Sequence, residues 1–184
     1  MDGRAPDIGH VLVLGGRRSG KSRFAEDLVL SSGRSPVYIA TATPGDGEMS
    51  ARIAAHRTRR GGAWRTIETP LLLADAVRGA ARDGSAVLVD CLTLWLANLM
   101  EAGLDIAAET AGLIATLEAA SGPVVIVSNE VGGGIIPDNA LARRYSDAHG
   151  LLNQRIAAAV GRVVLTVAGQ PLLLKPSPQG PILL

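Results

Sequence analysis

The sequence predicts an α/β fold in which a mostly parallel, twisted sheet of about six to seven strands carries helices on both faces. Short apolar runs rich in β-branched residues alternate along the chain with longer stretches rich in Ala, Leu and Arg. The stronger runs are apolar at successive positions, which is typical of parallel strands buried on both faces. Strands and helices that alternate in this way build β–α–β units, whose helices cover the sheet.

The apolar runs define seven expected strands, the last of which follows Pro171. They lie at residues 10–14, 37–40, 64–67, 86–90, 124–128, 163–167 and 172–175. The helices are expected between them, where helix-favouring residues gather and where Asp, Pro or Ser often stands near the start. They lie at residues 21–32, 47–60, 70–83, 92–102, 105–120 and 138–160.

The length of 184 residues favours a single domain over residues 1–184. Hydrophobic residues make up 47% of the chain and charged residues 19%, which excludes a disordered protein. Residues 1–8 are expected to form a loose N-terminal arm, and the Pro-rich residues 176–184 an extended C-terminal tail.

The charge pattern limits the kinds of molecule that the protein is expected to bind. A net charge of +1, from 18 basic and 17 acidic residues, excludes a polybasic nucleic-acid-binding protein. Lys21 and Lys175 are the only lysines, and the many arginines favour planar, bidentate contacts with phosphate. Cys91 is the single cysteine, so no intrachain disulfide forms. With no long apolar run and no signal-like N-terminus, we expect a cytoplasmic protein that is not embedded in a membrane.

The segment after the first expected strand matches the phosphate-binding pattern G-x-x-x-x-G-K-[ST]. Its residues are Gly15, Gly16, Arg17, Arg18, Ser19, Gly20, Lys21 and Ser22. Glycines let the chain turn so tightly that N–H groups point at phosphate oxygens, and the following helix N-terminus adds positive charge. Lys21 is expected to reach the β- and γ-phosphates and Ser22 to ligate Mg²⁺. A strand, this loop and a helix in order predict the P-loop NTPase fold and a bound nucleotide.

Asp90 closes the buried strand at residues 86–90, on the sheet edge where the phosphate loop is expected. An acidic residue at this position is the expected second anchor for Mg²⁺. The alternative is that Asp90 caps the helix at residues 92–102. The sequence contains no Asn-Lys-x-Asp segment, so the choice between ATP and GTP stays open.

A histidine among arginines marks the segment that spans residues 48–60. If the segment is helical, Arg52, His56, Arg59 and Arg60 share one face. Positive neighbours disfavour the charged imidazolium, which lowers the pKa of His56 and leaves a neutral, nucleophilic nitrogen. The alternative is a solvated basic helix face with a bystander histidine, which is the more ordinary interpretation of a charged run taken by itself.

The loop at residues 129–138 leaves the carboxyl end of the fifth expected strand, where ligands of open α/β sheets bind. Asn129 and Glu130 are candidates for contact with a polar substrate, and Asp138 is a candidate cap for the next helix. The alternative is a flexible, glycine-rich connector. His10 and His149 are weaker candidates for chemistry, and Cys91 is expected to be a packed thiol.

Taken together, these motifs resemble the bifunctional adenosylcobinamide kinase / adenosylcobinamide-phosphate guanylyltransferase family of cobalamin biosynthesis. The resemblance covers residues 11–175, and its specific parts are the His56 segment, the Trp-Arg-Thr-Ile-Glu stretch and the Asn-Glu-Val-Gly loop. The matching segments are residues 15–23, 38–42, 48–49, 52–53, 56–57, 64–68, 90–93, 128–132 and 153–155.

The resemblance implies two reactions. The first transfers the γ-phosphoryl group of ATP or GTP to the aminopropanol hydroxyl of adenosylcobinamide. The second moves GMP from GTP to that phosphate through a GMP–histidine adduct, for which His56 is the matching position, and yields adenosylcobinamide-GDP and pyrophosphate. The resemblance also implies a homotrimer. It further implies nucleotide contacts by Ala40, Thr41, Ala42, Arg57, Thr58, Arg59, Arg60, Glu68 and Asp90.

Two other classes of function remain as alternatives. One is a single-activity P-loop small-molecule kinase, in which His56 never carries GMP. The other is a nucleotide-dependent switch or a nucleic-acid-binding protein. The balanced charge, the 3% aromatic content and the absence of a base-stacking motif make this second class weak.

Overall fold

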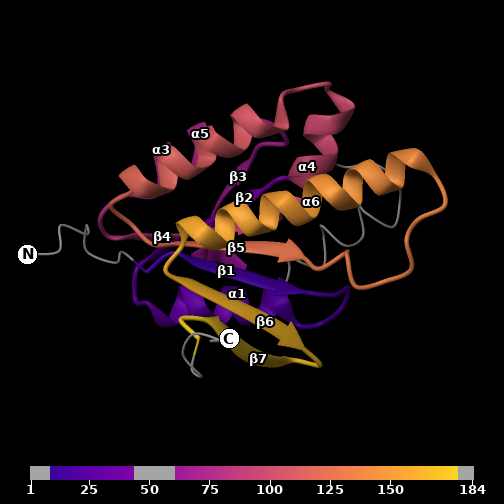
Figure 1. The fold of residues 1–184 in the computed structure, drawn as a ribbon. Helices are drawn as coiled ribbons and strands as arrows, with labels where there is room; N and C mark the ends of the chain where they lie inside the picture. Colours follow the sequence, from indigo (N-terminus) through magenta and orange to yellow (C-terminus); the bar gives the residue numbers. More distant parts are fainter. Residues whose placement is uncertain (1–8, 44–60, 178–184) are drawn as a thin grey trace, which may run out of the picture.

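A seven-stranded, twisted sheet forms the centre of the molecule, with helices on both of its faces (Figure 1). The computed structural model describes residues 9–43 and 61–177. The strand order is β3-β2-β4-β5-β1-β6-β7. The strands are β1 (Val11–Gly15), β2 (Ser35–Ala40), β3 (Arg65–Glu68), β4 (Ser85–Asp90), β5 (Val124–Asn129), β6 (Arg162–Val167) and β7 (Gln170–Lys175).

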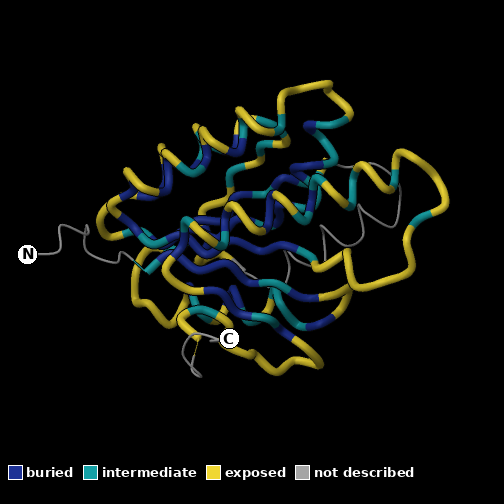
Figure 2. The backbone as a smooth tube through the Cα atoms, in the orientation of Figure 1, coloured by how far each residue is buried: buried dark blue, intermediate teal, exposed yellow. Residues whose placement is uncertain are grey.

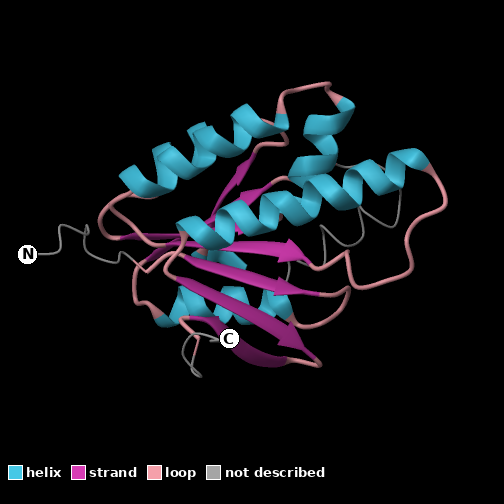
Figure 3. Cartoon of the chain, in the orientation of Figure 1, coloured by secondary structure: helices cyan, strands magenta, loops and turns pink. Residues whose placement is uncertain are grey.

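Every neighbouring pair of strands is parallel except β6 and β7, which form an antiparallel hairpin at one edge. The carboxyl ends of β1 to β6 therefore meet at one edge of the sheet, which is where α/β proteins bind their ligands. Figure 3 shows the strands of the sheet as arrows, with β7 turning back beside β6.

The helices divide unequally between the two faces of the sheet. They are α1 (Lys21–Ser31), η1 (Gly61–Ala63), α3 (Leu73–Ala80), α4 (Leu92–Glu101), α5 (Ile106–Ala119) and α6 (Ala140–Ala159). In Figure 1, α1 lies below the sheet, whereas α3 to α6 lie above it.

Two buried clusters, one on each face, form the core. Figure 2 shows that buried residues are concentrated along the central strands. The larger cluster packs α3 to α6 against the sheet and includes Trp95, Leu113 and Ile156, each 0% exposed. The smaller cluster packs α1 against the other face and includes Val13 and Val29. Because β1, β4 and β5 contribute to both clusters, they are apolar at successive positions, as the sequence predicted.

Two prolines stand inside strands at positions that cost no ladder hydrogen bond to a central neighbour. Pro36 pairs with Ala86 of β4, but pairing with β3 starts only at Val37, so the β3 side is open at Pro36. Pro171 lies in β7, the edge strand. Proline lacks an amide hydrogen, so both positions suit it.

The expected fold class is confirmed, and the strands begin and end within two residues of the predicted positions. The predicted helix at residues 70–83 is shorter than expected and spans Leu73–Ala80. The predicted helix at residues 47–60 and the predicted arm at residues 1–8 lie outside the described residues, as does most of the predicted tail. Within the described residues, no helix combines the length and the apolar character needed to cross a membrane.

Candidate functional site

The phosphate loop joins the carboxyl end of β1 to the first residue of α1, Lys21. A turn closes it, in which the Ser19 N–H donates to the Gly16 carbonyl at 3.2 Å. Gly20 has φ +95°, a left-handed conformation that other residues adopt only with strain. The loop therefore aims the N-terminus of α1 along the carboxyl edge of the sheet, which is the geometry that binds anions.

Gly15 is required because the chain leaves no room for a side chain there. An added Cβ would lie 2.5 Å from the Ser19 hydroxyl oxygen and 2.6 Å from the Thr166 carbonyl oxygen. The turn between β6 and β7 supports the loop from the same side, since the Gly169 N–H donates to the Ser19 carbonyl at 2.8 Å. This support from the C-terminal hairpin was not predicted from the sequence.

The loop carries charged and hydroxyl side chains around the place where phosphates are expected to bind. Lys21 Nζ donates to the Gly16 carbonyl at 3.1 Å, so the lysine folds over the loop. Arg17 and Arg18 are exposed, whereas Ser22 is half-buried at the start of α1. Ser19 is buried, and its hydroxyl has no hydrogen-bond partner among the described residues.

Asp90 ends β4, two strands from β1 in the order β4-β5-β1 and therefore about 10 Å away. Its carboxylate accepts a hydrogen bond from the Tyr38 hydroxyl at 3.2 Å. The alternative interpretation of Asp90 as a helix cap is wrong, because α4 has Cys91 at its N-cap position and no side-chain cap bond. Asp90 is thus a carboxylate at the sheet edge that can accept further hydrogen bonds or bind a cation.

The donor set suits Mg²⁺ better than a metal held by protein ligands alone. No group of three or more His, Cys, Asp or Glu side chains that could hold a metal ion occurs within the described residues. Mg²⁺ usually takes one or two protein oxygens and completes its shell with phosphates and water. Ser22, at the start of α1, and Asp90, at the end of β4, are the hydroxyl and the carboxylate that could provide such oxygens.

Cys91 is the packed thiol that the sequence predicted. Burial raises its pKa to about 11, the nearby negative charge of Asp90 adds to the rise, and Lys21 opposes it. Both of its main-chain polar groups bond to the buried Thr41 hydroxyl, which accepts from the Cys91 N–H at 2.9 Å and donates to the Cys91 carbonyl at 2.7 Å. Cys91 is therefore neutral and unreactive, and Thr41 fixes the chain beside Asp90.

The predicted nucleotide-contacting residues within the described part of the chain lie in one row along the carboxyl edge of the sheet. Ala40 is the register partner of Asp90 on one side and of Glu68, in the edge strand β3, on the other. Glu68 lies four strands from β1, about 19 Å away. The row therefore extends from the phosphate loop to the far edge of the sheet.

The catalytic candidate His56 and the predicted contacts Arg57, Thr58, Arg59 and Arg60 lie outside the described residues. The described chain stops at Thr43, just past the carboxyl end of β2, and resumes at Gly61, just before β3. His56 therefore belongs to the connection between the two strands that carry Ala40 and Glu68.

A buried polar cluster at the carboxyl end of β5 was missed. It joins Thr93 of α4, Ser128 of β5, and His149 and Asn153 of α6. His149 is 0% exposed, and burial lowers its pKa, which the charge of Glu130 partly opposes. The signal in the sequence was the spacing of His149 and Asn153, four residues apart on one helix face.

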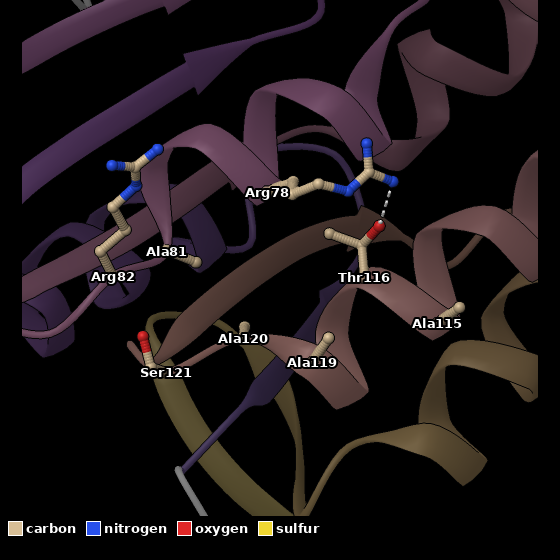
Figure 4. Close-up of a pocket in the computed structure, with 8 residues that line it drawn as sticks. All are labelled: Arg78, Ala81, Arg82, Ala115, Thr116, Ala119, Ala120 and Ser121. Atoms are coloured by element: carbon tan, nitrogen blue, oxygen red, sulfur yellow. Dashed lines mark hydrogen bonds between the residues drawn. The ribbon is translucent and has the colours of Figure 1, made fainter.

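A cavity of about 250 Å³ lies between α3 and α5, away from these groups (Figure 4). Arg78 and Arg82 extend along one side of it, and small residues of α5 line the other. Ala81 and Ser121, which also line it, precede β4 and β5. The cavity is therefore near the amino edge of the sheet and does not belong to the phosphate site.

Comparison with known proteins shows the family of this chain. A family model described as cobinamide kinase / cobinamide phosphate guanyltransferase matches residues 11–174. The chain belongs to this family. It is 50% identical over 169 residues to the bifunctional adenosylcobalamin biosynthesis protein CobP of Pseudomonas aeruginosa, covering 91% of this chain and 98% of that protein. It is 40% identical over 174 residues to CobU of Escherichia coli, a protein of the same description, covering 86% and 96%.

Solved structures of more distant proteins share the fold. The RadB recombinase superposes with a TM-score of 0.52 and 16% identity, covering 86% of this chain and 74% of that one. The ATPase EscN of a type III secretion system superposes with a TM-score of 0.55 and 11% identity, covering 88% and 43%. These likenesses place the chain in the P-loop NTPase fold class, and they carry no further statement about its function.

Proposed function

We propose that this enzyme carries out two successive transfers on a corrinoid. It phosphorylates adenosylcobinamide with ATP or GTP, and it then transfers GMP from GTP to the new phosphate, giving adenosylcobinamide-GDP and pyrophosphate. The observation that carries the proposal is the match to the family over residues 11–174, together with a phosphate loop that faces Asp90 across β5.

The phosphate loop serves the kinase reaction. Its main-chain N–H groups and Lys21 hold the β- and γ-phosphates, and Ser22 and Asp90 hold Mg²⁺. The metal, when bound, neutralises negative charge on the phosphates. The acceptor hydroxyl oxygen attacks the γ-phosphorus, the bond to the β–γ bridging oxygen breaks, and the hydroxyl proton passes to solvent. The nucleoside diphosphate leaves with the bridging oxygen.

The guanylyltransferase reaction is assigned to His56. Its neutral ring nitrogen attacks the α-phosphorus of GTP, and the bond to the α–β bridging oxygen breaks, so pyrophosphate leaves. An oxygen of the cobinamide phosphate then attacks the same phosphorus and releases His56. Arg57, Arg59 and Arg60 offset the charge that develops on the phosphates. Ala40, Thr41, Ala42, Thr58 and Glu68 complete the contacts with this nucleotide.

The far end of this row of residues supports the assignment to His56. Ala40 and Glu68 end the two strands that the segment containing His56 connects. By its family resemblance, the enzyme acts as a homotrimer, and adenosylcobinamide, its phosphate, ATP and GTP are its partners. Its single cysteine suits the reducing cytoplasm.

The deciding experiment uses GTP labelled on the α-phosphate, with Mg²⁺ and without corrinoid. After denaturation, we expect the wild-type protein to retain label that acid releases and alkali does not, because a phosphoramidate is acid-labile. The His56→Ala variant should retain none. A folded wild-type protein that binds GTP but retains no label would instead be a single-activity P-loop kinase.

A further inference from the structure

Asn129 ends the strand that lies between the phosphate loop and Asp90. The strand order β4-β5-β1 places β5 in the middle (Figure 1). Asn129 is the register partner of Gly15, the first residue of the phosphate loop. On the other side, Asp90 pairs with Val127, two residues before Asn129. Asn129 therefore stands at the sheet edge between the groups proposed to hold the terminal phosphates and the magnesium ion.

Side chains from two helices hold both main-chain polar groups of Asn129. Its N–H donates to Thr93 Oγ1 of α4 at 2.9 Å. Its carbonyl accepts from Asn153 Nδ2 of α6 at 3.0 Å. The next residue, Glu130, donates its N–H to the Gly15 carbonyl at 3.1 Å, which ties this corner to the phosphate loop.

His149 connects the two side chains that hold Asn129. The Ser128 hydroxyl donates to Asn153 Oδ1 at 2.7 Å, which fixes the orientation of the Asn153 amide. Asn153 Nδ2 therefore donates to His149 Nδ1 at 3.3 Å. The proton of the neutral ring is then on Nε2, which donates to Thr93 Oγ1 at 3.1 Å.

Burial makes this arrangement rigid. Ser128 and His149 are 0% exposed, and Asn153 is 7% exposed. A buried polar network in which each donor meets an acceptor resists rearrangement, since a lost bond leaves a desolvated group unpaired. Thr93, His149 and Asn153 thus fix the main chain of Asn129 and form no hydrogen bond with its side chain.

The carboxamide of Asn129 is half-buried, and it has no hydrogen-bond partner within residues 9–43 and 61–177. A carboxamide offers two N–H donors without carrying a charge. Such donors suit a phosphoryl oxygen, because a hydrogen bond to a charged acceptor is stronger than one between neutral groups. Its place between the loop and Asp90 is where the terminal phosphate of a triphosphate would lie.

We propose that the Asn129 carboxamide contacts the terminal phosphate of the bound triphosphate, and that Thr93, His149 and Asn153 are positioning residues that hold it there. The inference rests on the proposed function for the presence of a triphosphate in the phosphate loop. It adds a contact that distinguishes a nucleoside triphosphate from a diphosphate, and with it a way to recognise the substrate before transfer and to release the product after it.

The test compares GTP with GDP in the presence of Mg²⁺, by calorimetric titration of protein carrying His56→Ala so that no covalent step consumes the nucleotide. Adding Asn129→Ala should weaken GTP binding about 10-fold and leave GDP binding unchanged. Asn129→Asp should weaken GTP binding further, because a carboxylate repels the phosphate. An unchanged ratio of GTP to GDP affinity in both variants overturns the contact.

The failure of the proposed function gives a different result. A parent protein that binds neither nucleotide overturns the phosphate site, and this inference with it. A parent that prefers GTP to GDP, and keeps that preference when Asn129 is replaced, overturns the inference alone. This readout needs no corrinoid, so it does not depend on the identity of the phosphoryl acceptor.

The positioning residues are tested through Thr93→Val, which removes the acceptor for the Asn129 N–H but keeps the side-chain shape. The preference for GTP over GDP should fall about threefold or more, and the double variant with Asn129→Ala should lose no more than Asn129→Ala alone. Thr110→Val is the control, since this buried hydroxyl bonds only within its own helix, to the Ile106 carbonyl. If Thr93→Val lowers stability but keeps the GTP preference, the network is structural and the positioning role is wrong.

Discussion

Gly15 illustrates at the residue scale how packing, rather than backbone conformation, dictates an amino acid. The Gly15→Ala substitution places a methyl group 2.5 Å from the Ser19 hydroxyl and 2.6 Å from the Thr166 carbonyl, and the carbonyl belongs to the main chain. We expect a loss of about 1–3 kcal/mol in the free energy of unfolding, which urea denaturation would measure.

The neighbouring Gly16 provides the matched control for this prediction. A Cβ built on Gly16 meets no atom within 4 Å. Gly16→Ala should therefore change the free energy of unfolding by no more than about 0.5 kcal/mol. Equal stability of the Gly15→Ala and Gly16→Ala variants would contradict the packing argument.

His149 makes the stability of the protein depend on pH. Burial lowers its pKa in the folded chain below the value of 6.5 that it takes when unfolded. Between the two pKa values the unfolded chain binds more protons, so the free energy of unfolding rises with pH. The contribution is complete above pH 6.5 and is lost as the pH falls through the interval below it, by at most about 1.4 kcal/mol per pH unit.

Urea denaturation at pH 8.0, 6.5 and 5.5 would test this dependence. The His149→Gln variant is the reference, since it lacks the titrating ring and shares every other group with the wild-type protein. The wild-type protein should lose more stability than the variant on acidification. Parallel losses in the two proteins would show that His149 does not titrate differently on folding.

At the scale of elements, the predicted N-cap of α6 is wrong, for a physical reason. Asp138 was the expected cap, but Asn139 is the N-cap residue, and its side chain accepts from the Ala142 N–H at 2.7 Å. Both residue types are good caps, and they stand side by side, so the choice depends on the angle at which the chain enters the helix. A local sequence pattern does not contain that angle.

The two adjacent residues allow a direct test of the cap. Asn139→Ala should lower the free energy of unfolding by about 1 kcal/mol, because it leaves an N–H in the first turn of α6 without its partner. Asp138→Ala should leave it within about 0.5 kcal/mol of wild type, because only the carbonyl of Asp138 is used, as an acceptor for Arg143. Thermal or urea unfolding of both variants decides between them.

At the scale of the whole molecule, the sequence revealed the strands and the phosphate loop because those signals are local. A buried strand is apolar over successive residues, and the loop has a fixed pattern of glycine, lysine and serine. The order of the strands and the cluster around His149 involve residues that are distant in the chain: Thr93 and His149 are 56 residues apart. Such contacts exist only once the sheet is assembled, so no local sequence pattern predicts them.

The antiparallel hairpin of β6 and β7 joins distant parts of the chain in the same way. It supports the phosphate loop through Gly169, and its last residue, Lys175, closes the end of α6. Lys175 Nζ donates to the carbonyls of Ala157, Ala158 and Val160 at 2.8, 3.0 and 2.6 Å. A positive charge beside carbonyls that lack helical partners is favourable, so Lys175 fastens the edge strand to α6.

The two lysines of the chain therefore separate stability from ligand binding. Lys175→Met should lower the free energy of unfolding by about 1–2 kcal/mol, because three carbonyls lose their donor, yet it should leave nucleotide binding intact. Lys21→Met should change the unliganded Tm by no more than about 2 °C but should abolish binding of the triphosphate.

GTP at 100 times its Kd raises the Tm of a binding-competent protein by about 5–10 °C. Thermal unfolding with and without GTP and Mg²⁺ should thus show a lowered Tm and a full shift for Lys175→Met, and a nearly normal Tm and no shift for Lys21→Met. A GTP shift that survives in Lys21→Met would mean that the nucleotide binds elsewhere than in the phosphate loop.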